Sequence, residues 1–93
     1  VLKLPVAVFD DRERSLIYPN PATDDAWLHV GGRMSGEVRL EVIDALGRMV
    51  IEANPVVEDL RVPVLSGPLS PGHYTVRVVS SDGARIELPF IKG

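Results

Sequence analysis

The chain has 93 residues, a formal net charge of −3 and no cysteine, and 45% of its residues are hydrophobic. These values predict one folded domain with one core, and they exclude disulfides, thiolate metal sites and the clustered basic charge that nucleic-acid binding needs. Charged residues, glycine or proline interrupt every apolar run before it reaches the roughly 20 residues that span a bilayer.

The first residues of the chain are expected to be an arm that precedes the domain. Residues 1–9 are apolar and include Pro5, which an edge strand tolerates. They lack a starting Met and a basic region, so they do not resemble a secretory signal, and we expect the sequence to be cut from a longer protein. Such an arm adds readily to an exposed sheet edge, and this predicts a strand-exchanged homodimer.

A charged stretch follows the arm. We expect it to be an exposed connection that is accessible to proteolysis, because cleavage needs an open backbone. Its residues are Asp10, Asp11, Arg12, Glu13, Arg14 and Ser15. The predicted organisation is therefore an arm or linker over residues 1–14 and one domain over residues 15–93.

Apolar residues alternate with polar ones over most of the domain, and this period of two is typical of half-buried antiparallel strands. Val38, Leu40 and Val42 are expected to face the core. Glu37, Arg39 and Glu41 lie between them and are expected to face water. The same alternation points Tyr74, Val76 and Val78 inward on one later strand, and Ile86, Leu88 and Phe90 inward on the last. Shorter strands are predicted over residues 15–18, 26–30, 48–53 and 59–64.

Turn residues separate these strands. The chain has eight Pro and eight Gly, and no segment carries an apolar stripe at helical spacing, so helix content should be near zero. Asp82-Gly83 stands between two alternating runs and predicts a type I′ hairpin that pairs the last two strands directly. The expected fold is all-β, an immunoglobulin-like antiparallel sandwich of about seven strands.

Catalysis finds little support in the sequence. Ser66 precedes Gly67, but the residues around it match no nucleophile elbow, so we interpret it as a turn serine. His29 and His73 fall at outward positions of predicted strands and are interpreted as surface residues. No catalytic residue and no cofactor is predicted.

An acidic pair, Asp24-Asp25, and the single tryptophan, Trp27, could suggest a metal site or a sugar-binding site. Asp24-Asp25 lacks the spacing of a calcium loop and is better explained as a polar entry to a strand, so no metal site is predicted. Trp27 alternates with Leu28 and Val30. We expect the two aliphatic residues to face the core and Trp27 to be partly exposed, where a sugar-stacking role stays open.

Three clusters, taken in order, resemble the type A sorting domain at the C-terminus of type IX secretion cargo. Each cluster taken alone could also be explained as an ordinary turn sequence. The resemblance depends on the order of the clusters and on the strands around them. The clusters are Tyr18-Pro19-Asn20-Pro21-Ala22-Thr23-Asp24, Val42-Ile43-Asp44-Ala45-Leu46-Gly47-Arg48-Met49-Val50 and Leu69-Ser70-Pro71-Gly72-His73-Tyr74, followed by Gly83, Phe90 and Lys92. The final Gly93 departs from the family's ending.

The resemblance implies a sandwich that stays attached to an N-terminal cargo domain and crosses the periplasm with it. A shuttle protein and the outer-membrane translocon would recognise the sandwich, and a sortase-like peptidase would remove it at the cell surface. In this picture the domain is a substrate and not an enzyme. Cleavage is expected within the charged stretch.

Recognition is expected to read the folded shape, with residues 74–90 as a stable centre and residues 91–93 as a short accessible tail. Edge-strand pairing with a carrier would supply affinity, and Asn20 and Arg48 would supply selectivity. The alternative function is an adhesive or carbohydrate-binding module of an extracellular enzyme, with Trp27, Tyr18 or Tyr74 as exposed stacking rings.

Overall fold

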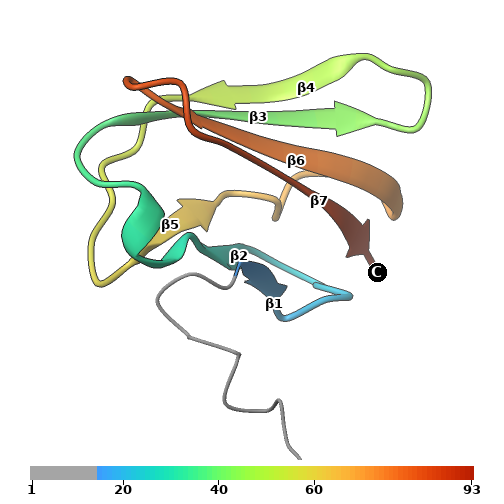
Figure 1. Ribbon diagram of the computed structural model, residues 1–93. Helices are drawn as coiled ribbons and strands as arrows, with labels where there is room; N and C mark the ends of the chain where they lie inside the picture. The colour runs from blue at the N-terminus through green and yellow to red at the C-terminus, as the bar shows by residue number, and fades with distance from the viewer. Residues whose placement is uncertain (1–14) are drawn as a thin grey trace, which may run out of the picture.

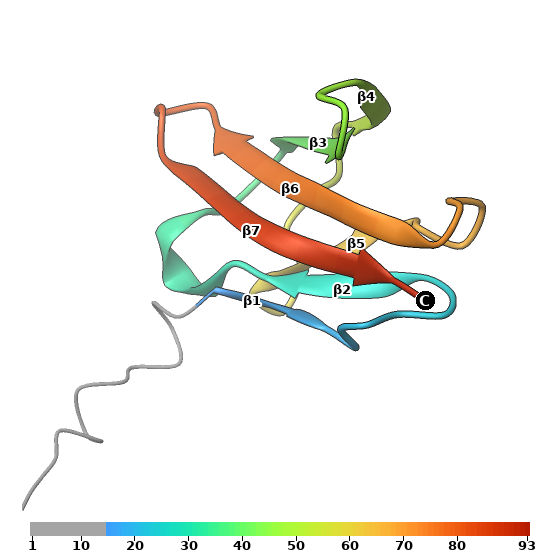
Figure 2. The same ribbon diagram turned by 90° about the vertical axis from the view of Figure 1, so that its right-hand side faces the viewer.

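The computed structural model describes residues 15–93 and consists of two antiparallel sheets that face each other (Figures 1 and 2). The smaller sheet has the order β1-β2-β5, formed by Leu16–Tyr18, Ala26–His29 and Arg61–Val64. The larger sheet has the order β4-β3-β6-β7, formed by Met49–Ala53, Val38–Asp44, Gly72–Ser80 and Arg85–Lys92. Helix within these residues is limited to one 3-10 turn, η2 (Gly31–Arg33). The predicted all-β sandwich of seven strands is confirmed.

The core lies between the two sheets and includes the residues that the alternation pointed inward, together with residues for which no orientation was predicted. Leu28 and Val30 are fully buried and Trp27 is 38% exposed, as predicted. Leu88 and Tyr74 are half-buried against the core. The other buried hydrophobic residues are Ile17, Ala22, Ala26, Met34, Val38, Leu40, Val42, Val62, Val64, Val76, Val78, Ile86 and Phe90.

One outward position of the larger sheet differs from the prediction. Glu41 was expected to face water, but it is only 7% exposed. It does lie on the outer face, where Arg39 (2.7 Å) and Arg77 (3.0 Å) cover its carboxylate. These bonds hold the pKa of Glu41 below its ordinary value, and the hydrogen bond from Arg39 has the largest effect. The long arginine side chains bury the acid that they neutralise.

Two turns also differ from the prediction. The β6–β7 turn contains three residues, because Ser80 N bonds to Ala84 O (2.9 Å) and of the loop residues only Gly83 has positive φ (92°). Type I′ is therefore wrong here, since that turn needs positive φ at both central residues. The Asp82 carboxylate accepts the Ala84 N–H (3.0 Å) and stabilises the longer loop. The two strands pair directly, as predicted.

Positive φ at two successive residues occurs instead before β5. Asp59 and Leu60 have φ of 54° and 64°, and Glu58 and Arg61 exchange both main-chain hydrogen bonds across them. This left-handed pair makes a tight turn, so β5 begins at Arg61 and not at the predicted residue 59.

The predicted arm over residues 1–9 and the charged residues Asp10, Asp11, Arg12, Glu13 and Arg14 lie outside the described residues. Ser15 is described; it is half-buried and stands directly before β1.

Candidate functional site

The three clusters lie far apart in the sequence and meet at one end of the sandwich. Asp44, at the end of β3, pairs with Tyr74 near the start of β6, and Gly72 pairs with Lys92 at the end of β7. Ala22 forms a parallel bridge with the same Lys92. We call this end, formed by loops 19–25, 45–48 and 65–71 and by residues 92 and 93, the motif end. Figure 1 shows the β3–β4 loop, the β1–β2 loop and the C-terminus together at the right.

The first cluster caps the outer edge of β7. The Asn20 side chain accepts the Ile91 N–H (2.9 Å) and donates to Pro89 O (3.4 Å). Ala22 N donates to Ile91 O (2.9 Å), and Gly93 N donates to Ala22 O (2.7 Å). The peptide bonds before Pro19 and Pro21 are both cis. The cluster thus occupies main-chain groups that would otherwise be free at a sheet edge.

The second cluster is a hairpin loop organised by one carboxylate. Asp44 Oδ1 accepts the N–H groups of Leu46 (2.9 Å) and Arg48 (2.8 Å), and Asp44 Oδ2 accepts Arg48 Nε (2.9 Å). Gly47 supplies the left-handed residue that the loop needs, with φ 85°. The main-chain bond from Arg48 and the bonds from its side chain and from Leu46 hold the pKa of Asp44 below its ordinary value. The loop is therefore closed while Asp44 is ionised.

The third cluster packs onto the end of β7. The Tyr74 hydroxyl donates to Ser70 O (2.6 Å). The centroid of the Tyr74 ring lies 6.4 Å from the centroid of the Phe90 ring. Leu69 is half-buried against the core. Gly72 is the first residue of β6 and pairs with Lys92. A shallow pocket of about 220 Å³ separates this cluster from the second and is lined by Asp44, Ala45, Leu46, Arg48, Pro71, Gly72, His73 and Tyr74.

Lys92 joins the C-terminus to the third cluster. It is only 5% exposed, and its ammonium donates to Gly67 O (3.0 Å) and Leu69 O (2.9 Å). Ile91 and Lys92 belong to β7, and Gly93 is bonded to Ala22. The prediction of an accessible tail over residues 91–93 is therefore wrong for Lys92, which is buried, while Ile91 and Gly93 are exposed but bonded to the first cluster.

The predicted site residues do not all gather in one place. Gly83 lies in the β6–β7 turn at the opposite end, and Ser15 precedes the far end of β1. Eleven come together at the motif end: Tyr18, Pro19, Asn20, Pro21, Asp44, Gly47, Arg48, Leu69, Gly72, Tyr74 and Lys92.

Two residues that the sequence indicated only as a turn serine and a polar strand entry, Ser66 and Asp25, help to hold this end. Ser66 is fully buried and its hydroxyl donates to Asp24 O (2.8 Å). Asp25 accepts the Gly67 N–H (2.7 Å). Both bonds join loop 19–25 to loop 65–71, across a separation of about forty residues. No local pattern indicates such a pair, although an acid directly after a turn is a common acceptor of main-chain N–H groups.

Residues 15–93 gather no three His, Cys, Asp or Glu side chains that could hold a metal ion. His73 is exposed and His29 is half-buried, both on outward positions of their strands. In the same part of the chain, no helix is long and apolar enough to cross a membrane.

A family model described as a secretion system C-terminal sorting domain matches residues 16–91. No curated protein and no solved structure matches the chain. The matched range begins at the first residue of β1 and ends one residue before the end of β7, so it covers the whole sandwich. It includes all the residues that form the motif end except the last two. The chain therefore belongs to the family of C-terminal sorting domains of the type IX secretion system.

Proposed function

We propose that the domain carries an N-terminal cargo across the periplasm to the outer-membrane translocon and on to the cell surface, as a substrate and not as an enzyme. The observation that supports this role is the motif end itself. Hydrogen bonds join the first and third clusters to the C-terminal strand, and the pairing of Asp44 with Tyr74 places the second cluster beside the third. A label read by other proteins needs such a fixed shape.

The residues available to a shuttle protein or translocon are those that project from the motif end. Leu46 is 77% exposed, and the Arg48 side chain is 72% exposed although it bonds to Asp44. Pro19 and Pro71 are exposed as well. The Asn20 side chain is hydrogen-bonded to β7, so in this proposal it stabilises the shape of the surface. Leu46 and Arg48 provide the selectivity.

We further propose that a sortase-like peptidase cuts within residues 10–15. The first strand residue is Leu16, and Ser15 stands at the end of β1 away from the motif end. A cut before β1 would leave the sandwich intact and would not disturb the recognised surface. The mass of the mature cargo tests this: it should lack residues 16–93, and a mature protein that keeps them would refute the cut.

Aromatic side chains give the carbohydrate-binding alternative little support. The Arg61 guanidinium lies 4.0 Å from the centre of the Trp27 ring and covers one of its faces. Arg61 also donates to the Tyr18 hydroxyl (3.4 Å). The Tyr74 ring packs against Phe90, and its hydroxyl donates to Ser70 O. All three candidate rings thus have partners within the domain.

The strand-exchanged homodimer stays a prediction, because the arm that would be exchanged lies outside the described residues. Sedimentation of the full chain over a range of concentrations tests it. A monomer at every concentration would refute it.

Fusion to an inert exported reporter, in a bacterium that has the type IX system, tests the sorting role. We expect the reporter to reach the surface, and we expect Arg48→Ala to reduce delivery. Arg85→Ala is the matched control, because Arg85 is also an exposed, ion-paired arginine but lies near the opposite end. Equal delivery by the two variants would count against a role for Arg48. A reporter retained inside the cell with the unchanged domain would refute the sorting role.

A further inference from the structure

Within residues 15–93 the sandwich has four edge strands, and three of them are protected against pairing. β1 is three residues long and is followed by Pro19. In β5, the outward main-chain groups of Arg61 are bonded to Glu58, and Pro63 has no N–H to offer. Short strands, proline and local capping are the devices that block edge-to-edge association.

β7 is protected in the same ways. Its outward groups belong to the odd-numbered residues, because Ser80 bonds to Ala84 on the other side of the hairpin. Pro89 lacks an N–H, and the first cluster occupies Ile91 N and O. The remaining outward positions carry the charged side chains of Arg85 and Glu87.

β4 is the exception. Val38 N donates to Pro55 O (2.9 Å) and Val57 N donates to Gly36 O (2.9 Å), so the ladder to β3 continues past the end of β4. The alternation of an antiparallel ladder then turns the N–H and C=O groups of Glu52, Asn54 and Val56 outward. None of these three is a proline, and no main-chain group of residues 15–93 is bonded to them. We call these three residues the acceptor edge.

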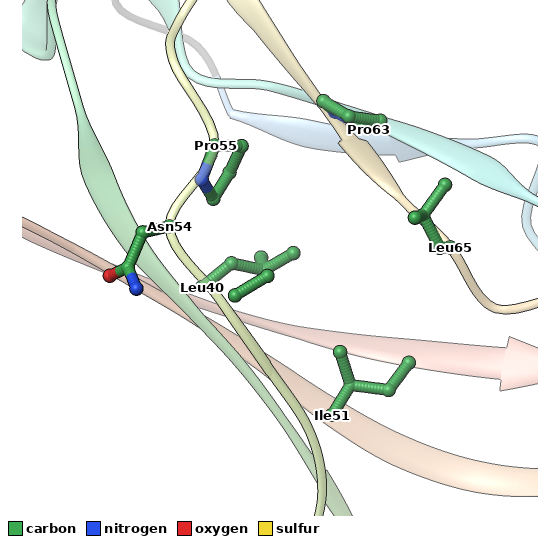
Figure 3. A pocket seen from close by; sticks show the side chains of 7 residues that line it. Leu40, Ile51, Asn54, Pro55, Pro63 and Leu65 are labelled. Atoms are coloured by element: carbon green, nitrogen blue, oxygen red, sulfur yellow. The ribbon is translucent and has the colours of Figure 1, made fainter.

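An apolar pocket of about 250 Å³ lies directly beside the acceptor edge (Figure 3). Ile51 and Pro55 stand on one wall, and Pro63 and Leu65 on the other, so the pocket opens between the edges of the two sheets. Leu40, Ala53 and Asn54 complete the lining. Leu65 is 59% exposed at the rim, so a side chain that entered here would remove apolar surface from water.

We propose that the acceptor edge and this pocket bind an extended strand of a partner protein, with apolar side chains at alternate positions. Only another extended main chain can match a row of alternating N–H and C=O groups. Successive side chains of such a strand point to opposite faces, so every second one faces the pocket. The strand would extend the larger sheet beyond β4 and close the gap to Leu65. The site follows from the fold alone and does not depend on the sorting role.

The probe is an acetylated, amidated seven-residue peptide in which leucine and valine alternate with threonine, added to the isotopically labelled full chain. Amide signals of Glu52, Asn54 and Val56 and methyl signals of Ile51 and Leu65 should shift. The same peptide with every nitrogen methylated keeps the side chains but has no donor, and it should not bind. Shifts centred on β1 or β7, equal binding of the methylated peptide, or no shift at millimolar peptide would overturn the proposal.

Glu52→Pro supplies the matched test on the protein. Proline at this outward position removes one edge donor and leaves the bonds to β3, as Pro63 and Pro89 do on other edges. Affinity should fall about tenfold, while Glu52→Ala, which removes the same side chain, should stay within about threefold. Equal affinities of the two variants, with melting temperatures like that of the unchanged chain, would overturn the proposal.

Two further outcomes would assign the site to a different occupant and so overturn the proposal, and the first of them is what a strand-exchanged homodimer at this edge would produce. If the Glu52 and Asn54 amides shift with protein concentration before any peptide is added, a second copy fills the site. If these amides are protected from hydrogen exchange in the dilute monomer, residues of the same chain fill it. Fast exchange at every concentration supports a free edge that awaits a partner strand.

Discussion

Replacing Asn20 by alanine removes the side chain that joins the first cluster to the C-terminal strand. The bond from Ile91 N at 2.9 Å is a full hydrogen bond, and the bond to Pro89 O at 3.4 Å is weaker. Asn20 is exposed, so water replaces part of what is lost. We expect the free energy of unfolding to fall by about 1–1.5 kcal/mol. For a domain of this size, that lowers the melting temperature by about 4–12 °C.

Thermal and urea denaturation measure this loss, and hydrogen exchange at the Ile91 amide locates it. Asn20→Asp keeps the acceptor for Ile91 N–H and should retain most of the stability. Asn54→Ala is the matched control, because Asn54 is an exposed asparagine for which residues 15–93 provide no such bond. An unchanged melting temperature for Asn20→Ala, or an equal loss for Asn54→Ala, would refute the view that Asn20 holds β7 in place.

Three other changes test the remaining features. Lys92→Met removes a buried ammonium from two loop carbonyls and should lower the free energy of unfolding by about 2–3 kcal/mol in urea denaturation; a loss below about 0.5 kcal/mol would contradict the view that Lys92 holds the C-terminus to the third cluster. Because Arg39 lowers the pKa of Glu41, the stability from this carboxylate is complete above pH 4.5 and declines as the pH falls through the lowered pKa. The urea midpoint should follow that decline, and Glu41→Gln should flatten it. The double change Asp59→Asn and Leu60→Gly suits the left-handed turn and should stabilise the domain by about 1 kcal/mol; no gain in melting temperature would show that the turn is unstrained.

The strands could be predicted because their causes are local. Alternation along β3 decides which side chains can share a face, and Pro and Gly decide where a strand must end. Two of the errors concern single residues. At Glu41 a charged residue became buried, because arginines from its own strand and from β6 reach over it. At Leu60 the needs of the tight turn overrode the poor fit of leucine to positive φ.

The motif end depends on contacts between residues that lie far apart in the sequence. The resemblance indicated which clusters matter, but Asn20 was expected to face a partner and instead bonds to residue 91. Ser66 and Asp25 were interpreted as a turn serine and a polar strand entry, and nothing in the local pattern indicated the bonds that they make across 42 residues. A hydrogen bond across some seventy residues leaves no periodic trace along the chain.

By itself, the sequence determined an all-β domain, the inward residues of its clearest strands, and membership of a family of sorting domains. Periodicity and turn chemistry are properties of neighbouring residues, so they can be read from the chain. Only the tertiary structure decided that the clusters meet at one end, that Lys92 is buried there, and that the β4 edge has no main-chain partner among residues 15–93 while the other edges are protected. These features depend on which strands become neighbours, and that choice is made by the packing of the two sheets against each other.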